Sequence, residues 1–495
     1  MTKAFPEATV WFVTGSQHLY GEEALRQVAD HAAVIASGLD ASDAIPARVA
    51  LQPVVTDPDG IRRLLEAADA DPACLGVIAW MHTFSPSKMW IAGLRSLRKP
   101  LAHLHTQLEA ELPWVTIDMD FMNLNQSAHG DREFGYMLTR LRIPRTTVVG
   151  HWQDPDVASR LGSWVRAAAG AAEAGRLRVC RFGDNMRQVG VTEGDKTEVQ
   201  VRLGVTIDGW GINELVAAMR EAPAADVDAV VADCLERYEM APELARGGER
   251  HESLRESAAI EVGLRTFLER GRYRAFTDSF EDLGELPQLP GLAVQRLMAD
   301  GYGFGGEGDW KTAALVRLLK VMATGLPGGS SFMEDYTYHL AGPRPRILGA
   351  HMLEVCPSIA SGRASCEIHA LGIGGKPDPV RLVFTARPGP GIVVGLVDHG
   401  DRLRLIANEV DLVEPNAPLP RLPVARAVWE PRPDLRTSAT AWLLAGGPHH
   451  TALSIGLPTD VVRDFARMVG VQLVLIDGAT TVRAAEDAYA AELLS

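Results

Sequence analysis

Cysteine is scarce in this chain, with five cysteines among 495 residues and no pair at the CxxC spacing. An odd, scattered set is typical of reduced thiols, which predicts a reducing, cytoplasmic location. Positive charge is also in deficit, because the formal net charge is −14. This excess of acidic groups argues against nucleic acid or an anionic membrane as the main partner.

Several common sequence features are absent as well. The apolar run VWFV (10–13) is far too short for a signal peptide core or a membrane span, so no membrane association is expected. The loop at 15–21 lacks GxGxxG, and GxSxG is missing around any plausible nucleophile. The glycine-rich run 301–308 lacks the Gly-Lys-Ser/Thr of a P-loop. These absences disfavour a dinucleotide, a P-loop nucleotide and a hydrolase elbow.

What the chain does contain is an alternation of short β-rich runs with helical patterns, as in 8–15, 48–55 and 74–81 and the segments between them. Such alternation predicts parallel sheets built from βαβ units. A second region of this kind begins near 177–189. The length requires more than one core, and we expect a doubly wound α/β domain at 1–175 and another at 176–325.

The last third changes character, because short β-like runs dominate and prolines are dense. This pattern predicts a β-rich, barrel-like C-terminal domain at 326–495. A helix at 459–470 and a strand at 471–477 are predicted to end the chain. The fold class is therefore two α/β domains followed by a β-barrel-like domain.

A single carboxylate, Glu307, stands within the glycines of 301–308. An anionic side chain in such a loop would repel phosphate, so a cation is the natural partner. Asp309, which directly precedes a helical pattern, is predicted to cap that helix.

Other polar residues also occupy places suited to apolar ones. Glu334 shares a strand face with Phe332, His351 interrupts an apolar strand, and His449 and His450 follow a Gly-Gly-Pro bend. Two carboxylates and two imidazoles suit Mn²⁺, Co²⁺, Fe²⁺ or Zn²⁺ and leave two positions for adjacent sugar oxygens.

His103 and His105 form a second possible metal pair, since both lie on one face of a predicted strand. The favoured interpretation of this pair is two buried histidines with hydrogen-bond partners.

Ten long blocks, in one order, carry a resemblance to the L-arabinose isomerase family that runs nearly end to end. They are WFVTGSQHLYG (11–21), MHTFSPSKMWI (81–91), DMDFMNLNQSAHG (118–130), GHWQD (150–154), CRFGDNMR (180–187), LPGLAVQRLMADGYGFGGEGDWKTAAL (289–315), SFMEDYTYH (331–339), HMLEVCPSIA (351–360), LGIGGKPDP (371–379) and LLAGGPHHT (443–451).

The resemblance implies a site and an assembly. The implied metal ligands are Glu307, Glu334, His351 and His450, with Mn²⁺ as the cofactor, Co²⁺ or Fe²⁺ as possible substitutes, and the two glutamates as the acid/base pair. The implied substrate pocket consists of Gln17, Leu19, Phe84, Met186, Phe280, Met352, Ile373 and His449, together with His129 from a neighbouring subunit. A homo-oligomer, a hexamer with shared sites, is implied as well.

The expected activity is metal-dependent aldose–ketose isomerisation of L-arabinose to L-ribulose, with D-galactose as a further substrate, by enediol proton transfer. Two alternatives stay open at this point: a metal-dependent lyase or dehydratase on a sugar or sugar acid, and a sugar-binding regulator without catalysis. Product mass separates isomerisation from dehydration. The residues leave open the preferred sugar, the native metal, and which glutamate removes the carbon-bound proton.

Overall fold

The structure is a computed structural model that describes residues 3–493, and the chain divides into two compact units. The first unit extends to Ala172 and includes Asp460–Gly470, whereas the second holds Glu173–Thr459 and the chain from Val471 onward. The domain boundaries predicted at 175 and 325 are finer than this division and stay a prediction.

The first unit is built on a five-stranded sheet in which every neighbouring pair is parallel, in the order β2-β1-β3-β4-β5. The strands are β1 (Phe5–Gly15), β2 (Ala47–Leu51), β3 (Cys74–Met81), β4 (Leu101–His105) and β5 (Thr146–Val149). The helices are α1 (Gly21–Ala41), α2 (Pro58–Ala70), α3 (Ile91–Ser96), α4 (Met119–Leu124), α5 (Ser127–Arg140), α6 (Pro155–Ala174) and α14 (Thr459–Val469).

Helices cover both faces of this sheet, as its sequence predicts. Strand β3 is buried at every position, which suits a central parallel strand. Its Val77 and Met81 share a core with α2, α3 and α5. Successive side chains alternate between faces, so Gly76 lies on the opposite face, where a Cβ would meet Trp164 of α6. The predicted doubly wound arrangement is therefore confirmed in this unit.

The second unit contains a smaller parallel sheet, in the order β10-β9-β6-β7. Its strands are β6 (Arg178–Phe182), β7 (Thr206–Trp210), β9 (Ala275–Thr277) and β10 (Gly303–Gly305). The accompanying helices are α7 (Lys196–Leu203), α8 (Ile212–Arg220), α9 (Ala224–Arg237), α10 (His251–Gly271), α11 (Gly291–Ala299) and α12 (Trp310–Met322). The carboxyl ends of parallel strands meet at one edge, which is where ligands bind in such sheets.

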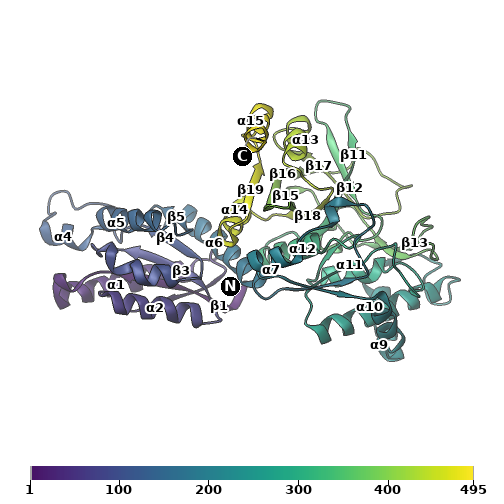
Figure 1. The fold of residues 1–495 in the computed structure, drawn as a ribbon, viewed down its shortest axis with the longest axis horizontal. Helices are drawn as coiled ribbons and strands as arrows, with labels where there is room; N and C mark the ends of the chain where they lie inside the picture. Colours follow the sequence, from purple (N-terminus) through teal and green to yellow (C-terminus); the bar gives the residue numbers. More distant parts are fainter. Residues whose placement is uncertain (1–2, 494–495) are drawn as a thin grey trace. The chain divides into compact units, whose positions relative to one another are not determined.

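A closed barrel of six antiparallel strands follows in the same unit, in the order β15-β18-β11-β12-β17-β16, and the pairing of β15 with β16 closes it. The strands are β11 (Ser330–His339), β12 (Arg346–Ala350), β15 (Gly389–Asp398), β16 (Leu403–Leu412), β17 (Arg426–Pro431) and β18 (His450–Ile455). Figure 1 shows them in green and yellow-green. The predicted barrel-like C-terminal fold is confirmed.

Smaller elements complete the unit. Strand β19 (Gln472–Ile476) pairs in parallel with β16, and β8 (Glu239–Met240), β13 (Ser365–Ile368) and β14 (Val380–Val383) form a three-stranded sheet. Helices α13 (Leu435–Leu444) and α15 (Val482–Glu492) pack together. The prediction that the strand at 471–477 ends the chain is therefore wrong, because α15 follows it. Thr481, whose side chain accepts from the Ala484 backbone, was the available N-cap signal for α15.

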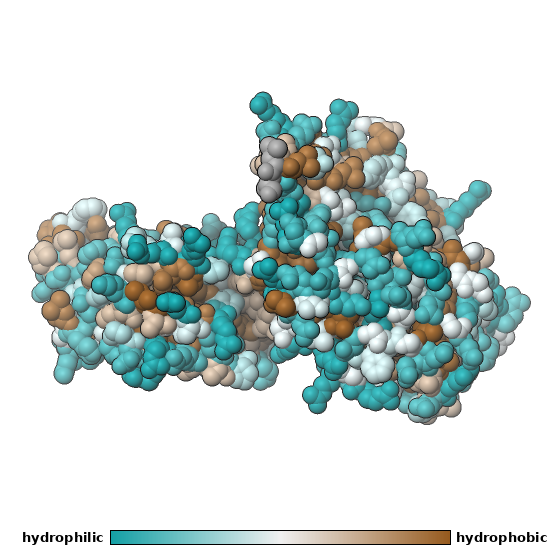
Figure 2. Space-filling view, in the orientation of Figure 1, coloured by the Kyte–Doolittle hydropathy of each residue, from teal (hydrophilic) through white to brown (hydrophobic). Residues whose placement is uncertain are grey.

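The described residues contain no helix that is both long and apolar enough to cross a membrane. Figure 2 shows one face of the molecule, on which hydrophilic side chains surround scattered apolar ones.

Candidate active site

Glu307 lies in the turn that connects β10 to α12. Its backbone is left-handed, with φ of 60°, and Gly308 follows with φ of 78°. A non-glycine residue in this region costs about 1–3 kcal/mol, and such strain gathers at functional sites. Asp309 then caps α12 by accepting from the backbone N–H groups of Lys311 and Thr312, as its position predicts. The glycine-rich sequence therefore allows a sharp turn that presents one carboxylate.

Backbone hydrogen bonds join this turn to the loops that follow two neighbouring strands. The N–H of Met186, after β6, donates to the carbonyl of Glu307 at 3.0 Å, and the N–H of Gly308 donates to the carbonyl of Asp278, after β9, at 2.8 Å. A Cβ on Gly308 would approach the Asp184 carbonyl to 2.5 Å. Glu307 is thus held by contacts that require glycine at the next position.

The other predicted ligands lie on two barrel strands and directly after a third one that is adjacent to them. Glu334 on β11 pairs directly with His450, the first residue of β18, and on its other side with Ala350 at the end of β12. His351 follows Ala350. Strand register, rather than a strained turn, therefore brings these side chains to one end of the barrel.

The imidazole of His450 is fully buried and lies against both glutamates. Its Nε2 is 3.2 Å from Glu334 Oε1 and 3.6 Å from Glu307 Oε2. Neither contact is a hydrogen bond, so this buried nitrogen has no hydrogen-bond partner among the described residues. Two carboxylates and an imidazole nitrogen that converge in this way fit a shared divalent cation.

A second carboxylate orients each predicted histidine ligand. His450 Nδ1 lies 3.0 Å from Asp309 Oδ2, and His351 Nδ1 lies 2.5 Å from Glu354 Oε2. A carboxylate on one ring nitrogen fixes the tautomer and leaves the other nitrogen free to bind a metal. Asp309 therefore both caps α12 and orients His450, and the sequence predicted only the cap.

The charges of the cluster are mutually stabilised. Burial alone would lower the pKa of His450, but its hydrogen bond to Asp309 and the two glutamates close to its Nε2 raise that pKa well above its usual value. Burial likewise opposes ionisation of Glu334, yet the nearby imidazole of His450, with His351 and His449, brings its pKa below the usual value. The site therefore holds ionised carboxylates around one positive charge, which is carried by the His450 imidazolium when no cation is bound and which a divalent cation would replace with release of that proton.

A second set of candidate ligand atoms overlaps this one. One ligand atom each from Glu307, His449 and His450 lie within 4.8 Å of one another. His449 is about half exposed, and its Nε2 is 3.9 Å from Glu334 Oε1. His449 was predicted as a substrate residue, so its position at the edge of the cluster suits either contact with sugar or a share in the cation.

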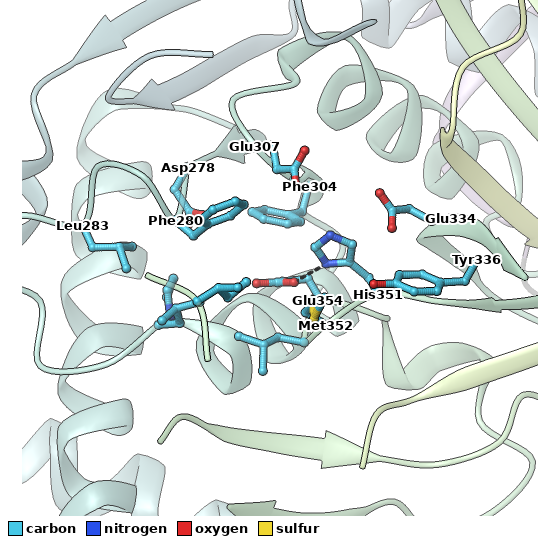
Figure 3. A pocket seen from close by; sticks show the side chains of 15 residues that line it. Asp278, Phe280, Leu283, Phe304, Glu307, Glu334, Tyr336, His351, Met352 and Glu354 are labelled. Carbon is cyan, nitrogen blue, oxygen red and sulfur yellow. Dashed lines mark hydrogen bonds and ion pairs between the residues drawn. The ribbon is translucent and has the colours of Figure 1, made fainter. Parts of the chain in front are cut away.

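A pocket opens beside these residues, and Figure 3 shows its lining. It includes the predicted residues Phe280, Glu307, Glu334, His351, Met352 and Ile373. Met186 lies outside this lining and joins the site through its backbone bond to Glu307. Sequence reasoning missed Asp278, Tyr336 and Glu354 as lining residues. For Asp278 a signal existed, since it directly follows a buried strand.

Four predicted substrate residues belong to the first unit. Gln17 Nε2 donates to the carbonyl of Phe84 at 3.0 Å, and the Phe84 ring stacks on His129 with centroids 4.7 Å apart. Leu19 is 84% exposed. Gln17, Phe84 and His129 thus form one surface cluster.

His103 and His105, the alternative metal pair, both contact one buried carboxylate. His103 Nε2 and His105 Nδ1 lie 2.8 Å and 2.7 Å from the two oxygens of Asp131. The favoured interpretation, two buried histidines with hydrogen-bond partners, is confirmed for His103, whereas His105 has its partner but is only partly buried.

Known proteins resemble this chain over almost its whole length. Family models described as the N-terminal, central and C-terminal domains of L-arabinose isomerase match residues 4–176, 178–325 and 329–472. A protein named L-arabinose isomerase from Nocardioides sp. is 62% identical, over 98% of this chain and 96% of its own length. Proteins of the same name from Acidothermus cellulolyticus and Arthrobacter sp. are 60% and 61% identical, over 98% and 96% of this chain and 96% and 93% of their own lengths.

Proposed function

The chain belongs to the L-arabinose isomerase family and is an isomerase of the intramolecular oxidoreductase class, and on that premise we propose that it converts L-arabinose to L-ribulose with the help of a divalent cation. The observation that carries the proposal is the convergence of Glu307 and Glu334 on the buried His450 at the wall of a pocket. Isomerisation moves a proton between two adjacent carbons, which requires paired acid/base groups.

Glu307, Glu334, His351 and His450 would hold the cation, for which Mn²⁺ is the proposed identity and Co²⁺ or Fe²⁺ are substitutes. When bound, the cation would supply Lewis-acid stabilisation of negative charge on two adjacent sugar oxygens. The carboxylate pairs Asp309–His450 and Glu354–His351 support this assignment, because they direct the free nitrogens of both imidazoles.

Glu307 and Glu334 act as the acid/base pair. One carboxylate takes the proton from C2 of the aldose and returns it to C1, and the other handles the hydroxyl proton that passes between O2 and O1. The lowered pKa of Glu334, set by His450 against the effect of burial, keeps this carboxylate ionised and able to accept a proton at neutral pH. Apolar side chains of the pocket, Phe280, Phe304 and Ile373 among them, exclude water from the reacting atoms.

The pocket lining also indicates what kind of molecule it receives. Four of its members are carboxylates, namely Asp278, Glu307, Glu334 and Glu354. So many hydrogen-bond acceptors favour a ligand rich in donors and disfavour an anionic one. A neutral, unphosphorylated aldose fits, and we propose D-galactose as a second substrate, converted to D-tagatose.

The cluster of Gln17, Phe84 and His129, with the exposed Leu19, is proposed to complete the substrate site. In this proposal His129 reaches the site of a neighbouring subunit in a homo-oligomer, a hexamer. A cytoplasmic location is proposed as well, since all five cysteines are buried and free.

The test is a conversion assay with chelator-stripped protein and L-arabinose, with and without Mn²⁺, in which L-ribulose and total product mass are measured. Ketose that forms only with the metal supports the proposal. A product lighter by one water would instead indicate a dehydratase, and sugar binding without any product would indicate a binding protein.

A further inference from the structure

Asp278 is a buried pocket residue to which no role is yet assigned. It directly follows β9, at the same edge of the parallel sheet as the Glu307 turn. Its side chain is among those lining the pocket (Figure 3), yet the residue is only 6% exposed. A carboxylate this deep is found in folded proteins when something satisfies it, because burying it alone is costly.

The carboxylate of Asp278, unlike the other carboxylates of the pocket, has an oxygen without a hydrogen-bond partner. Its Oδ2 is buried without a hydrogen-bond partner among the described residues. The other three pocket carboxylates each lie against a histidine: Glu307 and Glu334 against His450, and Glu354 against His351. Burial, together with the nearby Glu354, raises the pKa of Asp278 to about 7. The fold therefore maintains an unfavourable acceptor in the wall of its pocket.

The surroundings of Asp278 indicate what would satisfy it. On its side of the pocket lie Phe280 and Leu283, which offer no donor, while Glu334 and Tyr336 lie on the other side of His351 (Figure 3). The nearby His351 imidazole is engaged through Nδ1 with Glu354, and its other nitrogen is assigned to the cation, so we expect the donor for Asp278 to come with the ligand. Sugar hydroxyls are such donors, and those bound near Glu307 and Glu334 belong to the reacting carbons.

We propose that Asp278 binds a hydroxyl of the aldose other than those on C1 and C2, and thereby selects among sugars by that hydroxyl. This inference rests on the proposed function and deepens it, since it names a specificity-determining contact of the same site. A site with a buried polar group made for a substrate hydroxyl rejects an analogue without it, because the group is then left unpaired.

The experiment compares L-arabinose with its 3-deoxy, 4-deoxy and 5-deoxy analogues in the Mn²⁺-loaded protein. The native chain should turn over one analogue with kcat/KM reduced at least ~10-fold relative to L-arabinose. In Asp278→Ala, kcat/KM for L-arabinose should fall by a similar factor, mainly through a higher KM. The kcat/KM for that analogue should be the same in the variant as in the native chain. An equal loss on every substrate would overturn the proposal, because it would indicate a structural role alone.

Two further variants test whether misfolding explains a loss of activity in Asp278→Ala. Asp278→Asn keeps the shape of the side chain, and Ser279→Ala is a matched control, because Ser279 is as buried and adjacent but lies outside the described pocket lining. Asp278→Asn should alter the same analogue preference, and Ser279→Ala should leave it unchanged. Two outcomes would contradict the assignment. One is a changed preference between L-arabinose and that analogue in Ser279→Ala. The other is an unchanged preference in Asp278→Asn together with equal losses on all sugars in Asp278→Ala.

A binding measurement separates this inference from the proposed function. If the native chain makes no ketose, the proposed function fails, and calorimetric titration of L-arabinose into Mn²⁺-loaded protein still tests Asp278. An affinity that falls ~10-fold in Asp278→Ala supports the contact. Equal affinity in the native chain and in the variant overturns it.

Discussion

Glu307 and Glu334 reach the same histidine from two different kinds of backbone. Glu307 stands on a left-handed turn that depends on Gly308 and on hydrogen bonds from neighbouring loops. Glu334 stands on a barrel strand, where pairing with β12 and β18 fixes its position. The sheet side of the site thus depends on local strain, whereas the barrel side depends on register. The two glutamates are proposed to do the same chemistry but are positioned by different backbone structures, so substitutions should distinguish the two sides.

Replacement of either carboxylate should have the largest effect and should be equal on both sides. We expect Glu307→Gln and Glu334→Gln each to lower kcat at least ~10³-fold, since general acid/base catalysis alone supplies ~10²–10⁴-fold. Steady-state ketose formation at saturating Mn²⁺ is the measurement. Near-normal turnover in one variant would show that only one of the two glutamates carries the proton chemistry.

A change of backbone should distinguish the two sides. Gly308→Ala introduces a Cβ 2.5 Å from the Asp184 carbonyl at a φ of 78°, so the turn must shift and carry Glu307 with it. We expect kcat to fall ~10²-fold, the size associated with misplacement by about 1 Å. Gly400→Ala is the matched control, because φ there is 87° and no atom lies within 4 Å of the added Cβ. Equal losses of activity in the two variants would contradict the claim that the turn at Gly308 positions Glu307.

Asp309 links the two sides, because it belongs to the turn and contacts His450 on the barrel. In Asp309→Asn the amide oxygen can still cap α12, but the amide NH₂ would face His450 Nδ1 and favour the tautomer that protonates Nε2. We expect Mn²⁺ affinity to fall ~10–100-fold, measured by calorimetry, and the melting temperature to fall as well, because the buried Lys311 Nζ loses the carboxylate 3.5 Å away. Unchanged affinity would mean that the ring is oriented by its packing alone.

The smallest expected effect concerns stability on the sheet side. Asp278 ionises with a pKa near 7 in the folded chain and near 3.8 otherwise, because of burial and Glu354, opposed in part by His351. The folded state therefore binds more protons between these values, so the native chain should lose stability as pH rises from about 4 to 7.

Asp278→Asn lacks this ionisation, so its melting temperature relative to the native chain should rise across that interval and level off above pH 7. Both proteins should be free of metal. Asp335, whose pKa burial also raises to about 7, is present in both and cancels in the comparison. A difference independent of pH would contradict a buried, ionisable Asp278.

Sequence reasoning reached the parts of this molecule that depend on local pattern. Strand β3 is apolar throughout and was recognisable as a buried parallel strand, and Asp309 was recognisable as a helix cap. Glu307 was conspicuous because a carboxylate rarely stands among so many glycines. Each of these signals lies within a few residues of its effect.

Features that depend on long-range contacts could not be predicted from the sequence. The bond between Asp309 and His450 joins residues 141 positions apart, and no local pattern announces it. Asp464 of α14 accepts hydrogen bonds from Arg160 and from Thr146, the latter 318 positions away, within the first unit. Burial of Asp278 in the pocket likewise follows only from how β9, β10 and the barrel residues surround one space.

The most direct test of the account is the position of the cation. Crystals of the protein grown with Mn²⁺ should give, in an anomalous difference map, one strong peak per chain bound by Glu307, Glu334, His351 and His450. That result would establish that the strained turn and the barrel strands supply one metal centre. A peak held by Glu307, His449 and His450 without Glu334 and His351, or one elsewhere in the chain, would contradict it.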